Sequence, residues 1–268
     1  MRIDDLDTPR LVSGMADDIM RTLERFGLSW DGAVSRQSGH QEAYRDAFES
    51  LRRSGAIYPC GCSRKEIAML ASAPHAGDDG IPYPGTCRSG IRDNAVVRSY
   101  RVIVPDREIR FIDLCRGTIC QNPALSSGDF IVRRGDGVFS YQLAVVVDDY
   151  LTGVTQVVRG YDLLNSTGRQ LHLQQMLGLP SPAYCHLPLV TGPNGNKLSK
   201  RDNLVSNDNE AWRGNEGRLL WEILRFLGLN PPGDLAGESC DTLLCWGATT
   251  WSFASLPEQG GELDVRRG

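Results

Sequence analysis

Apolar side chains recur at helical spacing in two stretches near the start of the chain. In the first, they run from Ala16 to Phe26, and Ser13 stands where its hydroxyl could cap the first turn. In the second, residues 41–54, the pattern repeats and Gly55 follows. Spacings of three and four residues place such side chains on one helical face. The sequence therefore predicts two helices, each ended by a glycine.

A different pattern follows in residues 138–158. Val138 to Tyr141 is typical of a strand end, and the solid apolar run from Ala144 to Val147 must be buried. Gly153 ends that element, and Val154 to Val158 alternates like a second buried strand. This second strand runs directly into Arg159-Gly160-Tyr161-Asp162 and a new helix. Ligands of open α/β sheets bind where such strands end, although a core hairpin with solvated turn charges would give the same pattern.

The alternation of helices with short apolar strands predicts an α/β fold. Further strands are expected at 96–104, 109–114 and 186–190, with helices at 162–177 and 218–227 and a weakly patterned tail. We divide the chain into the first part of the main domain (1–57), an insert (58–128), the second part of the main domain (129–202) and a short helical C-terminal region (203–268).

Composition narrows the class of protein. The chain has 268 residues, a net charge of −4, and no apolar run of membrane-span length, so we expect a cytoplasmic protein without a membrane contact. Any nucleic-acid contact must depend on local basic clusters rather than on overall charge. Eight cysteines without an export signal predict reduced thiols or metal ligands.

Three of these cysteines lie in a pattern suited to a metal. Cys60 and Cys62 bracket a glycine beside a helix start, where Ser63 and Glu66 form a capping box, and Cys87 lies in another tight turn. Thiolates near a helix N-terminus are readily deprotonated and bind zinc tetrahedrally. Three incidental thiols are the alternative. The other cysteines show no paired spacing and are interpreted as core or surface residues: Cys115, Cys120, Cys185, Cys240 and Cys245.

The loop from Thr191 to Arg201 carries the clearest chemical signal. Glycine and proline make it sharply turned or mobile, and Lys197 and Lys200 follow at the edge of the predicted crevice. Such lysines can close over a polyphosphate, although a generic basic turn has the same composition. Lys-Leu-Ser-Lys after an apolar strand and a glycine-rich turn resembles the KMSKS loop of class I aminoacyl-tRNA synthetases.

Other segments resemble the glutamyl-tRNA synthetase branch of that family, in the same order and over residues 1 to about 230. Residues 2–10, RIDDLDTPR, resemble its R-I-E-D-x-D-x-x-R segment. Tyr141 with the V-V-D-D at 146–149 resembles its tyrosine-bearing strand and helix, and V-R-G at 158–160 resembles its arginine-bearing strand. The C-x-C at 60–62 with Y-x-x-x-C at 83–87 resembles the zinc ligands of the shortened glutamyl-queuosine tRNA(Asp) synthetases.

The resemblance implies a class I synthetase Rossmann-like nucleotide-binding domain with an inserted zinc-binding subdomain. It implies a ligase that activates L-glutamate with ATP, with Mg, and transfers it to queuosine in tRNA(Asp), acting as a monomer. Asp4, Tyr141 and Arg159 would hold the amino acid, since an arginine fork suits a carboxylate and an acidic group suits an ammonium. The implied ATP loop is Lys197, Leu198, Ser199, Lys200 and Arg201, with Lys200 catalytic, and the implied zinc ligands are Cys60, Cys62, Cys87 and Tyr83, with His75 the rival to Tyr83.

The sequence also departs from the family pattern. Asp4 stands where the family usually has glutamate, and the R-x-x-P-S-P-x-G and HIGH-type segments that precede R-I-E-D are not in these 268 residues. We therefore expect the functional protein to include an upstream segment, and we expect no anticodon-binding domain. Two alternatives stay open: a non-catalytic, zinc-containing remnant that binds tRNA or a protein, and a ligase with another acceptor.

Overall fold

The computed structural model describes residues 1–268 except 7–10, 64, 68–81, 93–94, 193–213 and 263–268. The centre of the described fold is a sheet of four strands in the order β6-β5-β9-β8. Their bounds are β5 (Ile109–Asp113), β6 (Gly117–Gln121), β8 (Gln156–Gly160) and β9 (Ala183–Leu187). Strands β5 and β8 both run parallel to β9, whereas β6 is antiparallel to β5. The ends of β5, β8 and β9 therefore meet at one edge of the sheet, as α/β topology requires.

Helix α5 (Tyr141–Leu151) corrects the first of the two strands expected in this region. Ser140 Oγ accepts a hydrogen bond from the backbone N–H of Leu143, and every residue from Leu143 to Asp148 is buried. A helix buried on all sides has no polar stripe, so its apolar run resembles a buried strand in sequence. The second expected strand exists as β8, but Val158 is 52% exposed, so it is not buried throughout.

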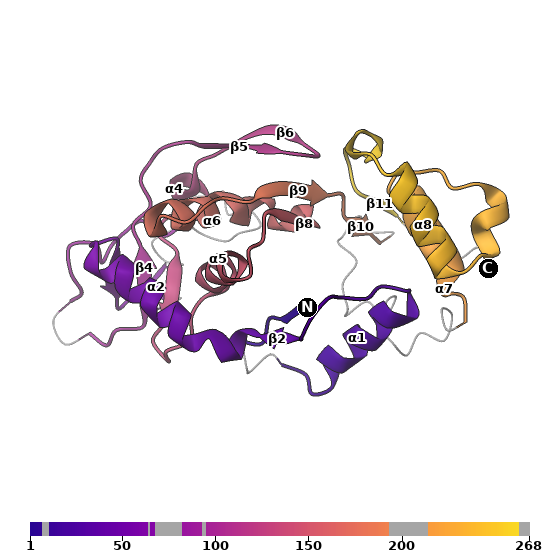
Figure 1. The fold of residues 1–268 in the computed structure, drawn as a ribbon. Coiled ribbons are helices and arrows are strands. Elements are labelled where there is room, and N and C mark those ends of the chain that lie inside the picture. Colours follow the sequence, from indigo (N-terminus) through magenta and orange to yellow (C-terminus); the bar gives the residue numbers. More distant parts are fainter. Residues whose placement is uncertain (7–10, 64, 68–81, 93–94, 193–213, 263–268) are drawn as a thin grey trace.

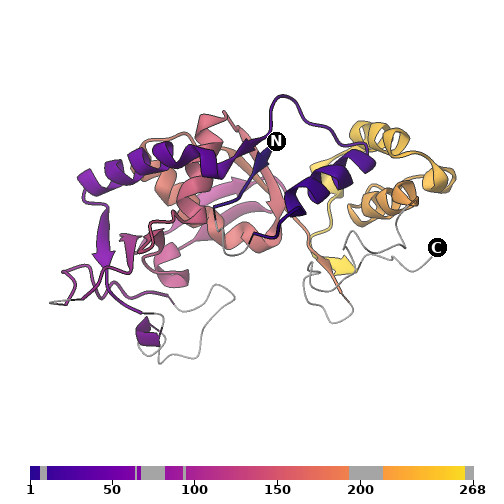
Figure 2. The same cartoon turned by 90° about the horizontal axis from the view of Figure 1, so that it is seen from below.

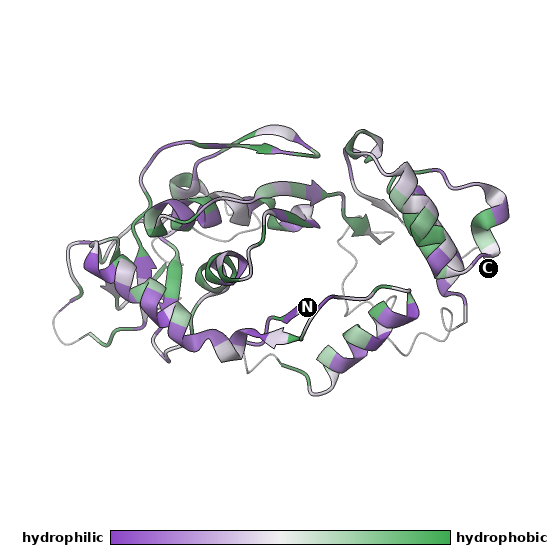
Figure 3. Cartoon of the chain, in the orientation of Figure 1, coloured by the Kyte–Doolittle hydropathy of each residue, from purple (hydrophilic) through white to green (hydrophobic). Residues whose placement is uncertain are grey.

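Two other helices pack beside α5: α2 (Gln41–Arg53), as predicted, and α6 (Leu164–Leu177), which follows the short 3-10 helix η3 (Tyr161–Leu163). Figure 1 shows α6 at the level of the strands β8 and β9, with α5 below them. The main core joins these helices to a second sheet, which contributes Val102 and Val132 against Phe48 and Leu143. The predominantly apolar α5 is visible in Figure 3.

The second sheet is antiparallel in the order β3-β4-β7, with bounds Ile57–Cys60, Ser99–Val102 and Ile131–Arg134. The short helix α4 (Pro123–Ser126) precedes β7. The predicted insert, residues 58–128, thus supplies strands to both sheets: β3 and β4 to this one, β5 and β6 to the main sheet. The division of the chain into the four proposed parts stays a prediction.

The N-terminal segment forms β1 (Arg2–Ile3), which pairs in parallel with β2 (Ser35–Arg36); η2 (Gln37–His40) leads from β2 into α2. Helix α1 (Met15–Arg25) begins after Gly14, whose φ is 79°, and no side chain in the described part of the chain caps it. The prediction that Ser13 caps this helix was therefore wrong: the left-handed Gly14 turns the chain into the helix instead. In Figure 2, α1 lies between the sheet-containing part and the two C-terminal helices.

Those C-terminal helices are α7 (Glu216–Phe226), predicted from its spacing, and α8 (Cys240–Thr250), which the weakly patterned tail did not reveal. They share a separate small core around Leu224 and Leu243. Gly247 permits their close approach, because a Cβ there would lie 3.0 Å from a Leu224 methyl carbon. The remaining elements are η6 (Gly233–Gly237), η7 (Phe253–Ser255), and the parallel pair β10 (Val190–Thr191) and β11 (Gly261–Glu262). None of the described helices is long and apolar enough to cross a membrane.

Candidate active site and cysteine cluster

Arg159 lies near the end of β8, directly opposite His186 of β9 in the parallel register. Its guanidinium donates two hydrogen bonds: Nε to Nε2 of His186 (3.1 Å) and Nη2 to Oγ1 of Thr167 on α6 (2.8 Å). It also lies over the Tyr184 ring, 5.3 Å from the centroid. Among the described residues, nothing hydrogen-bonds to Nη1 and no carboxylate pairs with this arginine. The side chain is thus oriented from one side while part of its fork stays open to a ligand.

Behind Arg159, His186 and Asp113 form a pair with fully buried side chains. Nδ1 of His186 lies 2.6 Å from Oδ2 of Asp113, and the same carboxylate accepts hydrogen bonds from the backbone N–H groups of Cys115, Arg116 and His186. Asp113 thereby joins the end of β5 to β9. No spacing in the sequence signals this pair, because its members lie on strands far apart in the chain.

A disulfide flanks the same pair. Cys115 and Cys185, 70 residues apart, are joined with a Cα–Cα distance of 5.4 Å. This corrects the interpretation of both as unpaired core or surface cysteines. The sequence could not predict the bond, because only the parallel pairing of β5 with β9 brings the two residues together.

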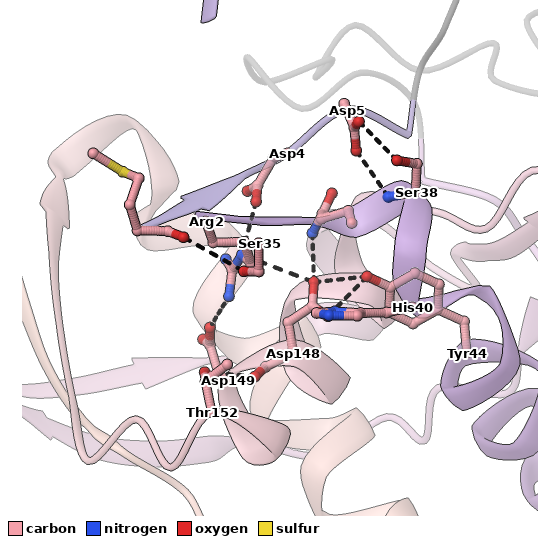
Figure 4. Close-up of polar contacts among 12 residues, drawn as sticks. Arg2, Asp4, Asp5, Ser35, Ser38, His40, Tyr44, Asp148, Asp149 and Thr152 are labelled. Carbon is pink, nitrogen blue, oxygen red and sulfur yellow. Dashed lines mark hydrogen bonds and ion pairs between the residues drawn. The ribbon is translucent and has the colours of Figure 1, made fainter. Parts of the chain in front are cut away.

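Asp4 follows strand β1 and pairs with Arg2, whose guanidinium also reaches Asp149 on α5 (Figure 4). Arg2 donates from Nε to Asp4 and from Nη1 to Asp149, with both distances 2.7 Å. The adjoining Asp148 is completely buried. It accepts hydrogen bonds from Gln37 and Tyr44 (2.8 Å each), and its Oδ1 lies 2.7 Å from Nδ1 of His40. The V-V-D-D segment thus anchors the beginning of the chain on α5, a structural role that the sequence motif alone does not specify.

Tyr141, the third residue predicted to hold the amino acid, is the first residue of α5 and is 40% exposed. Among the described contacts no hydrogen bond joins Asp4, Tyr141 and Arg159 directly. Tyr141 and Arg159 both act on Tyr184, whose pKa is raised by burial, lowered by Gln174 and Arg159, and raised by Asp149 and Tyr141. The predicted ATP loop, residues 197–201, and His75 lie outside the described residues.

The structure brings Cys60, Cys62 and Cys87 together, with their sulfur atoms within 4.8 Å of one another. The hydroxyl of Tyr83 lies among them, 3.3 Å from Sγ of Cys60 and 3.5 Å from Sγ of Cys62. Burial raises the pKa of the Cys60 thiol, but hydrogen bonds with Tyr83, the Cys62 backbone and Arg101 outweigh it and lower the pKa to about 7. Three convergent thiols, one close to its thiolate form, suit a soft divalent metal such as zinc.

Tyr83 is placed by its backbone. It forms a bridge with Gly128, whose φ is 63°, and a Cβ at that glycine would lie 2.1 Å from the Tyr83 carbonyl oxygen. Only glycine fits this crossing. The predicted capping box also forms, with Ser63 N–H donating to Glu66 (2.7 Å) and Glu66 N–H donating to Ser63 Oγ (3.2 Å).

Beneath the cysteines, a fully buried carboxylate, Asp129, organises the loop that carries Cys87. Arg88 donates to both of its oxygens at 2.6 Å, Tyr58 donates at 2.5 Å, and the backbone N–H of Val104 donates at 2.8 Å. Burial raises the pKa of Asp129, but these donors outweigh it, so the pKa lies below its usual value. This group could not be predicted from the sequence, since an isolated aspartate before a strand carries no signal.

Residues 1–236 match the family model described as "tRNA synthetases class I (E and Q), catalytic domain". The chain is 52% identical to the glutamyl-Q tRNA(Asp) synthetase of Geobacter sulfurreducens over 258 residues, which is 96% of this chain and 82% of that protein. It is 48% identical to the protein of the same name from Aromatoleum aromaticum over 97% of this chain and 80% of that protein. The fold is similar to the crystal structure of a glutamate tRNA ligase from Elizabethkingia meningosepticum, with a TM-score of 0.74 and 23% identity. That match covers 98% of this chain and 60% of the solved chain.

Proposed function

The chain belongs to the catalytic-domain family of the class I (E and Q) tRNA synthetases and is a ligase of that class, and from this we propose that it activates L-glutamate with ATP and transfers the glutamyl group to queuosine in tRNA(Asp). The observation that carries the proposal is the 52% identity, over 96% of the chain, to a protein named glutamyl-Q tRNA(Asp) synthetase. The geometry at the end of β8 supports the same amino acid, since an oriented arginine that has no carboxylate partner among the described residues suits an acidic substrate.

In this proposal, a carboxylate oxygen of glutamate attacks the α-phosphorus of ATP. The bond from that phosphorus to the bridging oxygen breaks, and pyrophosphate leaves; Mg bound to the ATP phosphates would neutralise part of their charge. A hydroxyl of queuosine then attacks the carbonyl carbon of the adenylate and AMP leaves. Because the α-carboxylate reacts, Arg159 would bind the side-chain carboxylate, Asp4 would bind the ammonium group, and Tyr141 would line the same site.

Asp4 is already engaged by Arg2 at 2.7 Å, which neutralises part of its charge. One methylene shorter than the family's glutamate, it would reach the ammonium group through a water or after a small shift. We assign the metal site to Cys60, Cys62 and Cys87, with the Tyr83 hydroxyl as the fourth donor. A zinc ion there would hold the Cys87 loop against β3 and would supply no chemistry to the transfer reaction.

The decisive experiment measures, in the complete enzyme, glutamate-dependent ATP–pyrophosphate exchange without tRNA, followed by transfer to tRNA(Asp) with and without queuosine. We expect exchange with glutamate and transfer only to the queuosine-containing tRNA. Exchange without discrimination between the two tRNAs would favour another acceptor. Absence of exchange would favour a non-catalytic binding protein.

The predicted ATP loop has its own test. In the complete enzyme, Lys200→Ala should slow exchange by on the order of 10²–10³-fold, because a loop lysine stabilises charge that develops only in the transition state. The melting temperature should hardly change. Near-normal exchange by this variant would show that the Lys-Leu-Ser-Lys assignment is wrong, whatever the acceptor proves to be.

A further inference from the structure

The support of Arg159 is built from a neutral imidazole rather than from a carboxylate. We propose that Asp113 and His186 are a positioning pair that sets the orientation of Arg159, so that carboxylate binding depends on an unprotonated Nε2 atom at His186. The proposal rests on the assignment of Arg159 as the ligand of the substrate carboxylate. Neither Asp113 nor His186 touches the substrate in this arrangement.

The partners of His186 determine its tautomer. Arginine has only donors, so Nε2 of His186 must accept the hydrogen bond from Arg159 Nε at 3.1 Å. Ionised Asp113 has only acceptors, so Nδ1 must carry the proton that is donated across 2.6 Å. Both arguments give the same Nδ1–H tautomer. Thr167 accepts from Arg159 Nη2 and lies 3.1 Å from Nε2, so its own hydroxyl proton can also be directed at the ring.

The surroundings of the ring favour this neutral form. The charged and titratable groups that face His186 are Asp113 on β5, Arg116 after β5, Arg159 on β8 and Tyr184 on β9, whose ring stacks on the imidazole with a centroid distance of 6.1 Å. Burial and the two arginines lower the pKa of His186, and Asp113 only partly offsets them. Protonation would place a donor and a positive charge against the Arg159 guanidinium and would turn it away from the sheet edge.

There is a physical reason why Asp113 acts on Arg159 through His186 rather than directly. A carboxylate placed directly on Arg159 would orient it equally well but would also neutralise it, and a second carboxylate would then bind weakly. A neutral acceptor fixes the fork and leaves its charge for the ligand. The negative charge of Asp113 lies one residue further from the ligand and is shared with three backbone N–H groups. The disulfide between Cys115 and Cys185 holds the two strands that carry the pair.

The first test compares two substitutions at His186. The terminal atoms of glutamine lie near the position of Nε2, so His186→Gln keeps an acceptor that cannot titrate, whereas His186→Leu removes it. We expect His186→Leu to raise the KM for glutamate by on the order of 10–100-fold, the range seen when a residue that orients a binding group is lost. We expect His186→Gln to recover most of this affinity. The KM for ATP should change much less in both variants.

The pH profile separates positioning from packing. In the wild type, the KM for glutamate should rise as the pH falls through the pKa of His186, which lies below the ordinary value of about 6.5. This rise should disappear in His186→Gln. An equal increase in the KM for glutamate in the leucine and glutamine variants would overturn the proposal. So would a glutamine variant whose KM for glutamate still rises at low pH as in the wild type.

Asp113→Asn tests the other member of the pair. The backbone N–H groups keep the asparagine oxygen on their side, so its NH₂ group faces Nδ1 and forces the Nε2–H tautomer, which then opposes Arg159 Nε. We expect a glutamate defect at least as large as that of His186→Leu. The matched control is His172→Gln, because His172 is also a buried histidine, but its Nε2 lies 2.9 Å from the Ile103 carbonyl oxygen and it does not contact Arg159. A comparable glutamate defect in the control would show that the effect is general damage to the core.

Nitrogen NMR of the ¹⁵N-histidine-labelled wild-type chain tests the arrangement without using activity. We expect His186 to be neutral with Nε2 unprotonated at pH 7, and His172 to be protonated at Nε2. A protonated Nε2 at His186 would overturn the proposal even if exchange is normal. The expected tautomer together with absent glutamate exchange would instead show that the proposed function is wrong while the positioning of Arg159 stands.

Discussion

Two buried aspartates each support an arginine, and they do so in different ways. Asp129 binds Arg88 directly through both carboxylate oxygens, and Tyr58 and a backbone N–H complete its coordination. Asp113 supports Arg159 only through the neutral ring of His186. In the first case the charge of the arginine is neutralised within the protein and stabilises a loop. In the second case the arginine is oriented while its charge stays available, which is what a binding site for an anion requires.

Substitutions in the two regions should therefore change different properties of the protein. Substitutions around Asp129 and the cysteines should change stability and metal content, and substitutions around Asp113 should change the affinity for glutamate. The predictions below test this contrast, beginning with the largest expected effect.

Cys60→Ser should abolish zinc binding. The wild-type chain purified without chelator should contain about one zinc per chain, and the variant should contain essentially none, because a hydroxyl replaces one of three thiolate donors. Elemental analysis measures this, and hydrogen exchange should show lost protection in β3 and around Cys87. The control is Cys120→Ser, which changes an exposed cysteine outside the cluster and should keep the metal. A wild-type chain without zinc would contradict the assignment.

Arg159→Ala should raise the KM for glutamate by on the order of 10²-fold or more, because a charged contact to a bound carboxylate is lost and the site is left without its cation. The KM for ATP should change far less. Steady-state exchange at varied glutamate and at varied ATP separates the two effects. A similar increase in the KM values for glutamate and ATP would mean that Arg159 is structural, like Arg88, and would remove the contrast between the regions.

Asp129→Ala should destabilise the fold by about 3 kcal/mol, because a buried hydroxyl and a buried backbone N–H lose their acceptor and Arg88 loses its partner. Denaturant unfolding measures the loss. The matched control, Asp136→Ala, removes a surface pair with Arg134 in the same region and should cost less than about 1 kcal/mol. If Asp129→Ala raises the KM for glutamate while leaving stability intact, the assignment of this region to structure is wrong.

Mild acid should produce the smallest of these effects, a gradual loss of folding stability. The pKa values of His172 and His186 are both lowered by burial, so the unfolded chain binds more protons than the folded chain once the pH falls below about 6.5. Stability is therefore fully present above that pH and is lost as the pH falls through the folded pKa values, by at most about 1.4 kcal/mol per pH unit for each histidine. Denaturant midpoints between pH 8 and pH 5 measure the slope, which should be reduced in both His172→Gln and His186→Gln. Only the second variant should change the pH dependence of glutamate binding.

What the sequence alone determined depends on short-range patterns. The spacing of apolar residues predicted α2 and α7, and the Ser63–Glu66 capping box was predicted from a separation of three residues. The order of motifs along the chain identified the family, because a series of weak matches in one order is specific. The same local reasoning selected the three cysteines that the structure brings together.

Only the tertiary structure determined the contacts between elements that are distant in sequence. The apolar run at 144–147 is a helix because α2, α6 and the second sheet surround it, and no property of the run itself states this. Cys115 meets Cys185, Asp113 meets His186, and Arg88 meets Asp129 because the strands that carry or precede them are paired in a particular order and register. Each partner alone is an ordinary residue near a strand end. The physical reason is that the role of a buried charge or thiol depends on the group opposite it, and the register of the sheet determines which group that is.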